Sequence, residues 1–156
     1  MKKTIAGLLA IWMLVTTMAA GFAFYSFADV TEYDLTEFPR KTVEVGWGSL
    51  GVNKGLDGGK IDMRNSSGKV EVYEKGLVAH AASELTFDVK GKFVTRITAL
   101  CGVERASNNN ALDSASVTFK VLADGVVMYE SPVVRDKSGS ISIDVTIPGG
   151  TKILTL

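Results

Sequence analysis

Apolar and polar residues alternate along most of the chain after Ser83. The apolar side chains take every second position in 85–89, 117–123 and 141–147. A half-buried β-strand requires this period of two, because successive side chains point to opposite faces of the sheet. No stretch after residue 28 has a convincing helical period, so the pattern predicts an all-β fold.

Turn residues separate the alternating runs. Asp124-Gly125 favours a hairpin, because both residues tolerate the positive φ that a tight turn needs. Lys90-Gly91-Lys92 is a second predicted turn. A long strand is predicted to follow it, with an apolar face made of Phe93, Ile97, Ala99, Cys101 and Val103. Many short strands joined by such turns are typical of an antiparallel β-sandwich of the jelly-roll type.

The signals before Ser83 are weaker. Short strands are predicted at 42–47, 60–63 and 70–73, with a turn-rich stretch between the last two. Residues 49–59 are rich in glycine, and no regular element is predicted there. Later in the chain, residues 107–113 form a polar stretch that predicts a loop.

The N-terminus resembles an export signal. Lys2 and Lys3 precede an uncharged apolar run over 5–24, and small residues offer cleavage points after Ala23 or Ala28. The alternative is an uncleaved anchor, since about 20 apolar residues just span a bilayer. In both cases the domain leaves the cytoplasm. The chain then divides into a signal peptide (1–28), a lead-in (29–41) and a β-sandwich module (42–156).

The charge of the exported part excludes some partners. Without residues 1–28 it carries fifteen basic and seventeen acidic side chains. This balance predicts no nucleic-acid footprint and no polybasic patch for anionic lipid. Membrane contact is expected only if the N-terminal segment is retained. Cys101 is the only cysteine, so no internal disulfide can form.

Residues 73–83 hold the single histidine of the chain, His80. Its neighbours Ala79, Ala81 and Ala82 are small, which leaves an imidazole accessible, whereas core positions usually carry bulkier branched side chains. We therefore place the candidate functional surface around this segment.

Several pieces of the chain resemble the NPCBM family of carbohydrate-binding modules, which occur beside secreted glycoside hydrolases such as those of family 98. In chain order the pieces are Gly46-Trp47-Gly48, the run from Lys75 to Leu85, Gly102-Val103, the run from Ser116 to Gly125, and Tyr129-Glu130-Ser131. The resemblance extends over residues 33–156. It implies a calcium-associated β-sandwich that binds terminal, galactose-like sugars without catalysis, with a glycoside hydrolase as a partner.

The chain departs from the family pattern at three places. Val78 stands where the family usually has a second glycine, and Arg105 follows Glu104 where acidic residues are common. The family also continues past the strand that starts at Lys152, whereas this sequence stops at Leu156. The expectation from this last difference is a sandwich that lacks its final strand, as in a truncated gene product.

Four residues are candidates for sugar binding. A sugar site needs an aromatic face for C–H groups and a few charged or amide groups for hydroxyls. Trp47, between two glycines, is a candidate platform, or alternatively a plug at the rim of the sandwich. His80 is a hydroxyl ligand or a structural histidine. Lys75 and Glu104 are candidates to donate to and accept from a sugar, or else solvated surface charges.

Catalytic readings have less support. No nucleophile-elbow pattern surrounds Ser83, Cys101 falls on an apolar face where a thiol acts as a small hydrophobe, and no acidic pair is arranged for glycoside cleavage. One histidine and one cysteine do not make a zinc site. Calcium could bind around residues 53–57, although no EF-hand spacing exists.

We therefore predict non-catalytic carbohydrate binding outside the cytoplasm. The first alternative is an envelope protein-interaction or structural domain on the same sandwich. The second is a fragment of a secreted glycoside hydrolase.

Overall fold

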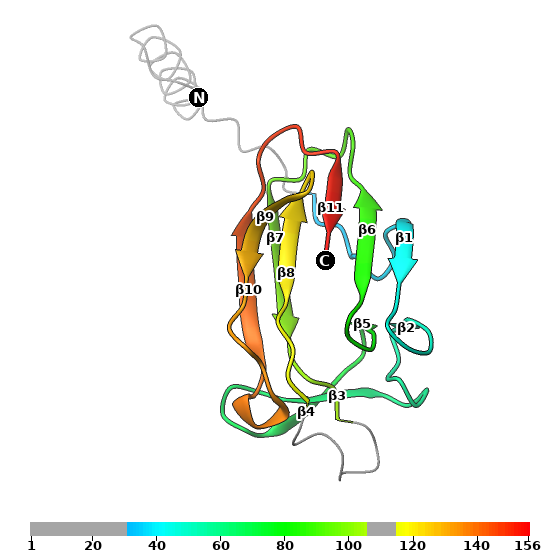
Figure 1. Ribbon diagram of the computed structural model, residues 1–156, viewed down its shortest axis with the longest axis vertical. Helices are drawn as coiled ribbons and strands as arrows, with labels where there is room; N and C mark the ends of the chain where they lie inside the picture. Colours follow the sequence, from blue (N-terminus) through cyan, green and yellow to red (C-terminus); the bar gives the residue numbers. More distant parts are fainter. Residues whose placement is uncertain (1–30, 106–114) are drawn as a thin grey trace, which may run out of the picture. The chain divides into compact units, whose positions relative to one another are not determined.

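The computed structural model describes residues 31–105 and 115–156 (Figure 1). The predicted signal segment and the predicted polar loop at 107–113 lie outside the described residues. Residues Tyr33–Leu156 form one compact unit. No helix in the described parts is long and apolar enough to cross a membrane.

The described residues form eleven strands and one short 3-10 helix. The strands are β1 (Arg40–Glu44), β2 (Gly51–Val52), β3 (Ile61–Arg64), β4 (Val70–Tyr73), β5 (Leu77–Val78), β6 (Glu84–Asp88), β7 (Arg96–Cys101), β8 (Lys120–Ala123), β9 (Val126–Glu130), β10 (Ile141–Thr146) and β11 (Ile153–Thr155). The helix, η2, covers Asp136–Ser138. The predicted all-β fold is confirmed.

Two antiparallel layers enclose the core. One is a five-stranded sheet in the order β1-β6-β11-β8-β9, and the other is the pair β10-β7. The hairpin pair β3-β4 and the short pair β2-β5 lie outside these layers. β11 is inserted between β6 and β8, with Leu154 opposite both Phe87 and Ala123. The predicted Asp124-Gly125 hairpin is confirmed, since it joins β8 to β9 and both residues have positive φ.

The alternation seen in the sequence fills the space between the layers. The five-stranded sheet contributes Leu85, Phe87, Val121, Ala123 and Leu154, and β7, β10 and their flanks contribute Ile97, Ile143, Val145 and Ile147. Burial of each large apolar side chain stabilises the fold by about 1.5–3 kcal/mol. Phe38 of the lead-in is also buried and packs edge-on against Phe87.

Several local predictions are wrong. On the predicted strand face, Ala99 is exposed and Val103 lies beyond the end of β7 at Cys101. Phe93 does not lie on the buried face of a strand, because β7 begins only at Arg96; Phe93 has a φ of 52° and is 87% exposed. The turn at Lys90-Gly91, closed by the Lys92 N–H to the Val89 carbonyl, ends before Phe93, and no strand has begun there. The glycine-rich stretch 49–59 does contain a regular element, since Gly51–Val52 pairs with Leu77–Val78. A two-residue strand is too short to leave an alternation in the sequence.

The strands separate two sets of loops (Figure 1). The chain runs along β6 from the His80 segment to the Lys90 turn, and the loop after β1 lies beside the start of β6, because Glu44 is opposite Glu84. We call the end that carries the loops after β1 and before β6 the site end. The opposite end carries the β6–β7, β8–β9 and β10–β11 connections.

Candidate functional site

The two aromatic rings singled out in the sequence meet at the site end. The ring centroids of Trp47 and His80 lie 4.9 Å apart, with an interplanar angle of 73°. Trp47 is 73% exposed, whereas His80 is half-buried. The indole is therefore not a buried plug. It stands on the surface, supported from one side by the imidazole.

The glycines around Trp47 make this contact feasible. A Cβ atom on Gly46 would lie 2.6 Å from the backbone oxygen of Ala81, so only glycine allows the two segments to come so close. The Gly46 N–H points to the His80 carbonyl oxygen at 3.4 Å. Gly48 has a φ of 72°, which glycine adopts without strain, and it also lies beside the imidazole. The tryptophan loop is thus fastened to the histidine segment through its backbone.

Glu104 lies three residues after the end of β7. Its backbone pairs with Met63 in an isolated bridge, and its carboxylate oxygens accept the Leu56 N–H at 3.2 and 3.3 Å. Burial raises the pKa of Glu104, the Leu56 hydrogen bond opposes this, and the charges of Asp57 and Asp62 raise it further. His80 is close enough to lower the same pKa. Glu104 therefore lies within reach of the His80 charge.

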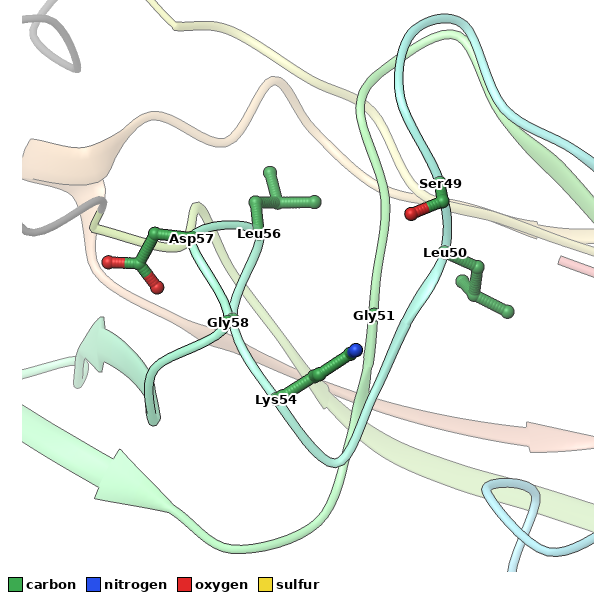
Figure 2. Close-up of a pocket in the computed structure, with 8 residues that line it drawn as sticks. Ser49, Leu50, Gly51, Lys54, Leu56, Asp57 and Gly58 are labelled. Atoms are coloured by element: carbon green, nitrogen blue, oxygen red, sulfur yellow. The ribbon is translucent and has the colours of Figure 1, made fainter.

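A hollow of about 260 Å³ lies in the loop next to these residues. It is lined by Ser49, Leu50, Gly51 and residues 54–58. Figure 2 shows the Ser49 hydroxyl and the Lys54 ammonium turned toward this hollow, and the Asp57 carboxylate turned away from Ser49. A Cβ on Gly55 would meet Glu104 Oε1 at 2.1 Å, so this glycine lets the carboxylate reach the edge of the hollow.

Lys75 is held elsewhere. Its ammonium lies 2.6 Å from Asp34 and 2.7 Å from Glu37, both in the lead-in. These carboxylates raise the pKa of Lys75, and the lysine lowers the pKa of Asp34 to about 2. The structure brings Trp47 and His80 together, places Glu104 within reach of the His80 charge, and gives Lys75 the role of an ion-paired link to the lead-in. A part for Lys75 in sugar binding stays a prediction.

Sequence reasoning missed the buried ion pairs next to Glu104 in the chain. Asp136, in η2, is buried and pairs with Arg64 of β3 at 3.1 Å and with Arg105 at 3.6 Å. The Arg105 N–H also donates to the Asp62 carbonyl. In the sequence Arg105 stands out only as a departure from the family pattern, and no local signal links it to an aspartate 31 residues away.

The described residues give limited support to a metal. Among them, no group of three or more His, Cys, Asp or Glu side chains is placed to hold an ion. The Asn53 and Asp57 side-chain oxygens instead accept backbone N–H groups, from Gly76 and Gly59. Calcium also binds through amide and backbone oxygens, so calcium binding around residues 53–57 stays a prediction.

The thiol of Cys101 is unsuited to nucleophilic attack. It is half-buried in β7, opposite Ile141, and burial raises its pKa to about 11. The thiolate is the reactive form, so this cysteine is protonated near neutral pH.

Comparison with known proteins agrees with this geometry. The sequence profile of the NPCBM/NEW2 domain matches residues 31–156. A Clostridium perfringens protein named blood-group-substance endo-1,4-beta-galactosidase is 31% identical in an alignment 106 residues long, and the match covers 62% of this chain and 13% of that protein. The chain thus spans a small part of this curated relative.

Solved structures share the fold. A CBM51 domain from a Clostridium perfringens GH95 protein, in complex with methyl-galactose, has a TM-score of 0.69 and 24% identity over 79% of this chain and 83% of the other. A Clostridium perfringens ZmpB structure, with a catalytic domain and two CBM51 domains, has a TM-score of 0.70 and 28% identity over 79% of this chain and 12% of the other. These modules are distinct from the catalytic domains beside them. The chain belongs to the NPCBM/NEW2 domain family and is a non-catalytic carbohydrate-binding module on a β-sandwich.

Proposed function

We propose that this module binds terminal, galactose-like sugars outside the cytoplasm, on the surface formed by Trp47, His80 and Glu104. The observation that carries the proposal is the exposed Trp47 indole held against the half-buried His80 ring. An exposed indole offers apolar area that a ligand can bury. Because the His80 contact fixes its orientation before binding, less conformational entropy is lost when the ligand binds.

Each group has a distinct part in the proposed complex. The Trp47 indole packs against the C–H face of the sugar. The His80 imidazole and the Glu104 carboxylate take the hydroxyls, and hydrogen bonds to an ionised carboxylate are about twice as strong as neutral ones. The hollow beside Glu104, with the Ser49 hydroxyl and the Lys54 ammonium turned toward it, takes the neighbouring part of the glycan (Figure 2).

The sugar class comes from the relatives. One structural neighbour is solved with methyl-galactose, and the curated relative carries the name of a galactosidase. Association with a glycoside hydrolase and export belong to the same proposal, since the relatives carry such modules as parts of larger proteins. A shallow polar site binds one sugar weakly, so attachment to an enzyme or to repeated ligands supplies avidity.

A glycan array followed by calorimetry tests the proposal. We expect a signal for glycans ending in galactose or a related sugar, lost in Trp47→Ala and in His80→Ala. Val126→Ala is the matched control, because Val126 is also an exposed side chain but lies on β9, at the end of the sandwich opposite the site. If folded Trp47→Ala and His80→Ala bind the same glycans as strongly as the control, the assigned surface is wrong.

A further inference from the structure

The end of the sandwich opposite the site carries an exposed aromatic residue among lysines. Phe93 is 87% exposed, the largest exposure among the described apolar side chains of large size. Lys90 and Lys92 flank it on the same turn. Lys152 lies next to Lys90, because its carbonyl accepts the Val89 N–H at 2.8 Å. We call Lys90, Lys92, Phe93 and Lys152 the lysine end.

The fold does not need the Phe93 side chain. It lies outside the core cluster, and its backbone has a φ of 52°, a conformation that glycine or asparagine adopts more readily than phenylalanine. A bulky apolar residue in a strained and solvated position points to a role outside the fold.

At this end the acidic side chains bond to the backbone of the turns, whereas the lysine side chains are exposed to solvent. Asp88 and Asp124 are the acidic residues of these turns, and their carboxylates accept backbone N–H groups from Lys90 and Lys152 respectively. The lysine side chains at 90, 92 and 152 are exposed. Lys92 lies 5.7 Å from the centre of the Tyr33 ring, which ties the loop to the first residues of the compact unit. The exported chain is slightly acidic as a whole, yet folding collects three cations at one end.

We propose that the lysine end docks on an anionic lipid bilayer, with Phe93 inserted at the interface and the lysines on the headgroups. Lysines beside an exposed aromatic are the combination that such surfaces attract. The sequence supplies a second argument, since an uncharged apolar run over 5–24 precedes Tyr33 by only eight residues. Those residues reach at most about 30 Å, so a chain that retains this run keeps the lysine end near the bilayer.

Docking in this way would present the sugar site to the outside. β6 separates the lysine end from the Trp47–His80 pair, since the chain enters β6 from the His80 segment and leaves it toward Lys90 (Figure 1). One phenylalanine and three lysines bind lipid weakly on their own. A tether raises their effective concentration at the surface enough to fix the orientation.

The test uses the full chain, including residues 1–32, reconstituted with vesicles of phosphatidylcholine and phosphatidylglycerol that contain a lipid spin-labelled on its acyl chain. We expect the extra fluorescence of Phe93→Trp, relative to the parent chain, to be quenched and shifted to shorter wavelength. Val72→Trp is the matched control, because it places a tryptophan at an exposed position outside the lysine end. Equal quenching of the two variants would overturn the proposal.

Charge reversal separates the electrostatic part. The double variant Lys90→Glu/Lys152→Glu, made in the Phe93→Trp background, leaves the Lys92–Tyr33 contact intact. Its partition onto the bilayer, read from the quenching, is expected to fall by about thirtyfold or more. Vesicles of phosphatidylcholine alone should give the same loss. Quenching that persists unchanged in both would contradict recognition of an anionic surface.

A sugar-binding role for Phe93 is the competing outcome. Phe93→Ala should leave glycan-array signals as they are. If it abolishes them as Trp47→Ala does, while quenching of Phe93→Trp matches the control, this end is a second sugar contact and the lipid proposal is wrong.

Discussion

Among the described residues, the two most exposed aromatic side chains, Trp47 and Phe93, lie near opposite ends of β6, and the two are held very differently. Trp47 is fastened by a ring contact to His80 and by the close approach of Gly46 to Ala81. Phe93 has no ring partner among the described residues, and its own backbone is strained. One aromatic is pre-organised, and the other is presented without support.

The difference matches the ligands that we propose. A sugar offers a small face and fixed hydroxyl directions, so its platform gains from being held in one geometry. A lipid interface is broad and fluid, so a side chain that enters it must project from the surface but does not need one fixed orientation. The site end should therefore be sensitive to changes in packing and ion pairing, and the lysine end should be tolerant of them.

Removal of the buried carboxylate at Asp136 is expected to have the largest effect. Asp136→Asn removes the buried negative charge that Arg64 and Arg105 share, which costs about 3–5 kcal/mol of folding free energy. It also loosens Glu104, the residue before Arg105, so sugar affinity should fall in the protein that remains folded. Urea unfolding and calorimetry measure the two effects.

Asp144→Asn is the matched control for this change. Asp144 pairs with Arg96 at 2.5 Å, but both side chains are more than half exposed, and such pairs contribute little. We expect a nearly unchanged urea midpoint. Equal destabilisation by the two substitutions would show that burial at Asp136 does not matter.

A methyl group on Gly46 is expected to be the next most damaging change. In Gly46→Ala the new Cβ meets the Ala81 backbone oxygen, so the tryptophan loop and the histidine segment must separate. Overpacking of this kind costs about 1–3 kcal/mol. Sugar affinity should fall by about tenfold or more, because Trp47 loses its support.

Gly149→Ala controls for the general effect of replacing a loop glycine. No atom lies within 4 Å of the place that a Cβ on Gly149 would take, and the residue has no positive φ. Stability should therefore stay level or rise by less than about 1 kcal/mol. Retention of full sugar affinity by Gly46→Ala would break the claim that this loop is pre-organised.

The sequence predicted the parts of this molecule that depend on local pattern. Alternation located the core strands, and Asp124-Gly125 located a hairpin, because both signals are set by neighbours in the chain. The Trp47–His80 pair was also within reach, since glycines and small residues mark two segments that can come close. The insertion of β11 between β6 and β8 left no such local mark, because it depends on pairing across distant segments.

The misses share a tertiary cause. Asp136 looked like one surface acid among seventeen acidic residues, and only the fold reveals its two arginine partners. Phe93 continued an apolar alternation in the sequence, yet the turn before it rotates the backbone to positive φ and carries the side chain outward. Periodicity reports the side-chain direction only where the backbone is extended.

The pH dependence of binding tests the Glu104 part of the site end. The pKa of Glu104 is raised in the folded protein. The free energy of unfolding that this group contributes is therefore greatest below the pKa of the unfolded chain, and it is lost as pH rises through the pKa of the folded protein. Sugar affinity should change in the opposite sense, because the ionised carboxylate is the acceptor for hydroxyls.

Glu104→Gln separates these contributions. The amide does not titrate, so both pH profiles should lose the step that the carboxyl causes, and affinity at neutral pH should fall by about tenfold. Calorimetry and urea unfolding from about pH 4 to 8 cover the relevant range. An affinity that is flat with pH in the parent protein would remove Glu104 from the sugar site.

Relief of backbone strain at Phe93 is expected to be the smallest effect and of opposite sign. Phe93→Asn places a residue that tolerates positive φ where the core loses nothing, so the free energy of unfolding should rise by about 1 kcal/mol. Phe93→Ala also removes the ring but lacks the side-chain amide whose local hydrogen bonds ease positive φ, so it should give no comparable gain. Both variants should bind sugar like the parent chain, because Phe93 lies at the other end of β6. Equal stabilisation by Asn and Ala would show that the exposed ring of Phe93, and not its backbone conformation, destabilises the fold. The contrast between a supported and a strained aromatic residue would then depend on Trp47 alone.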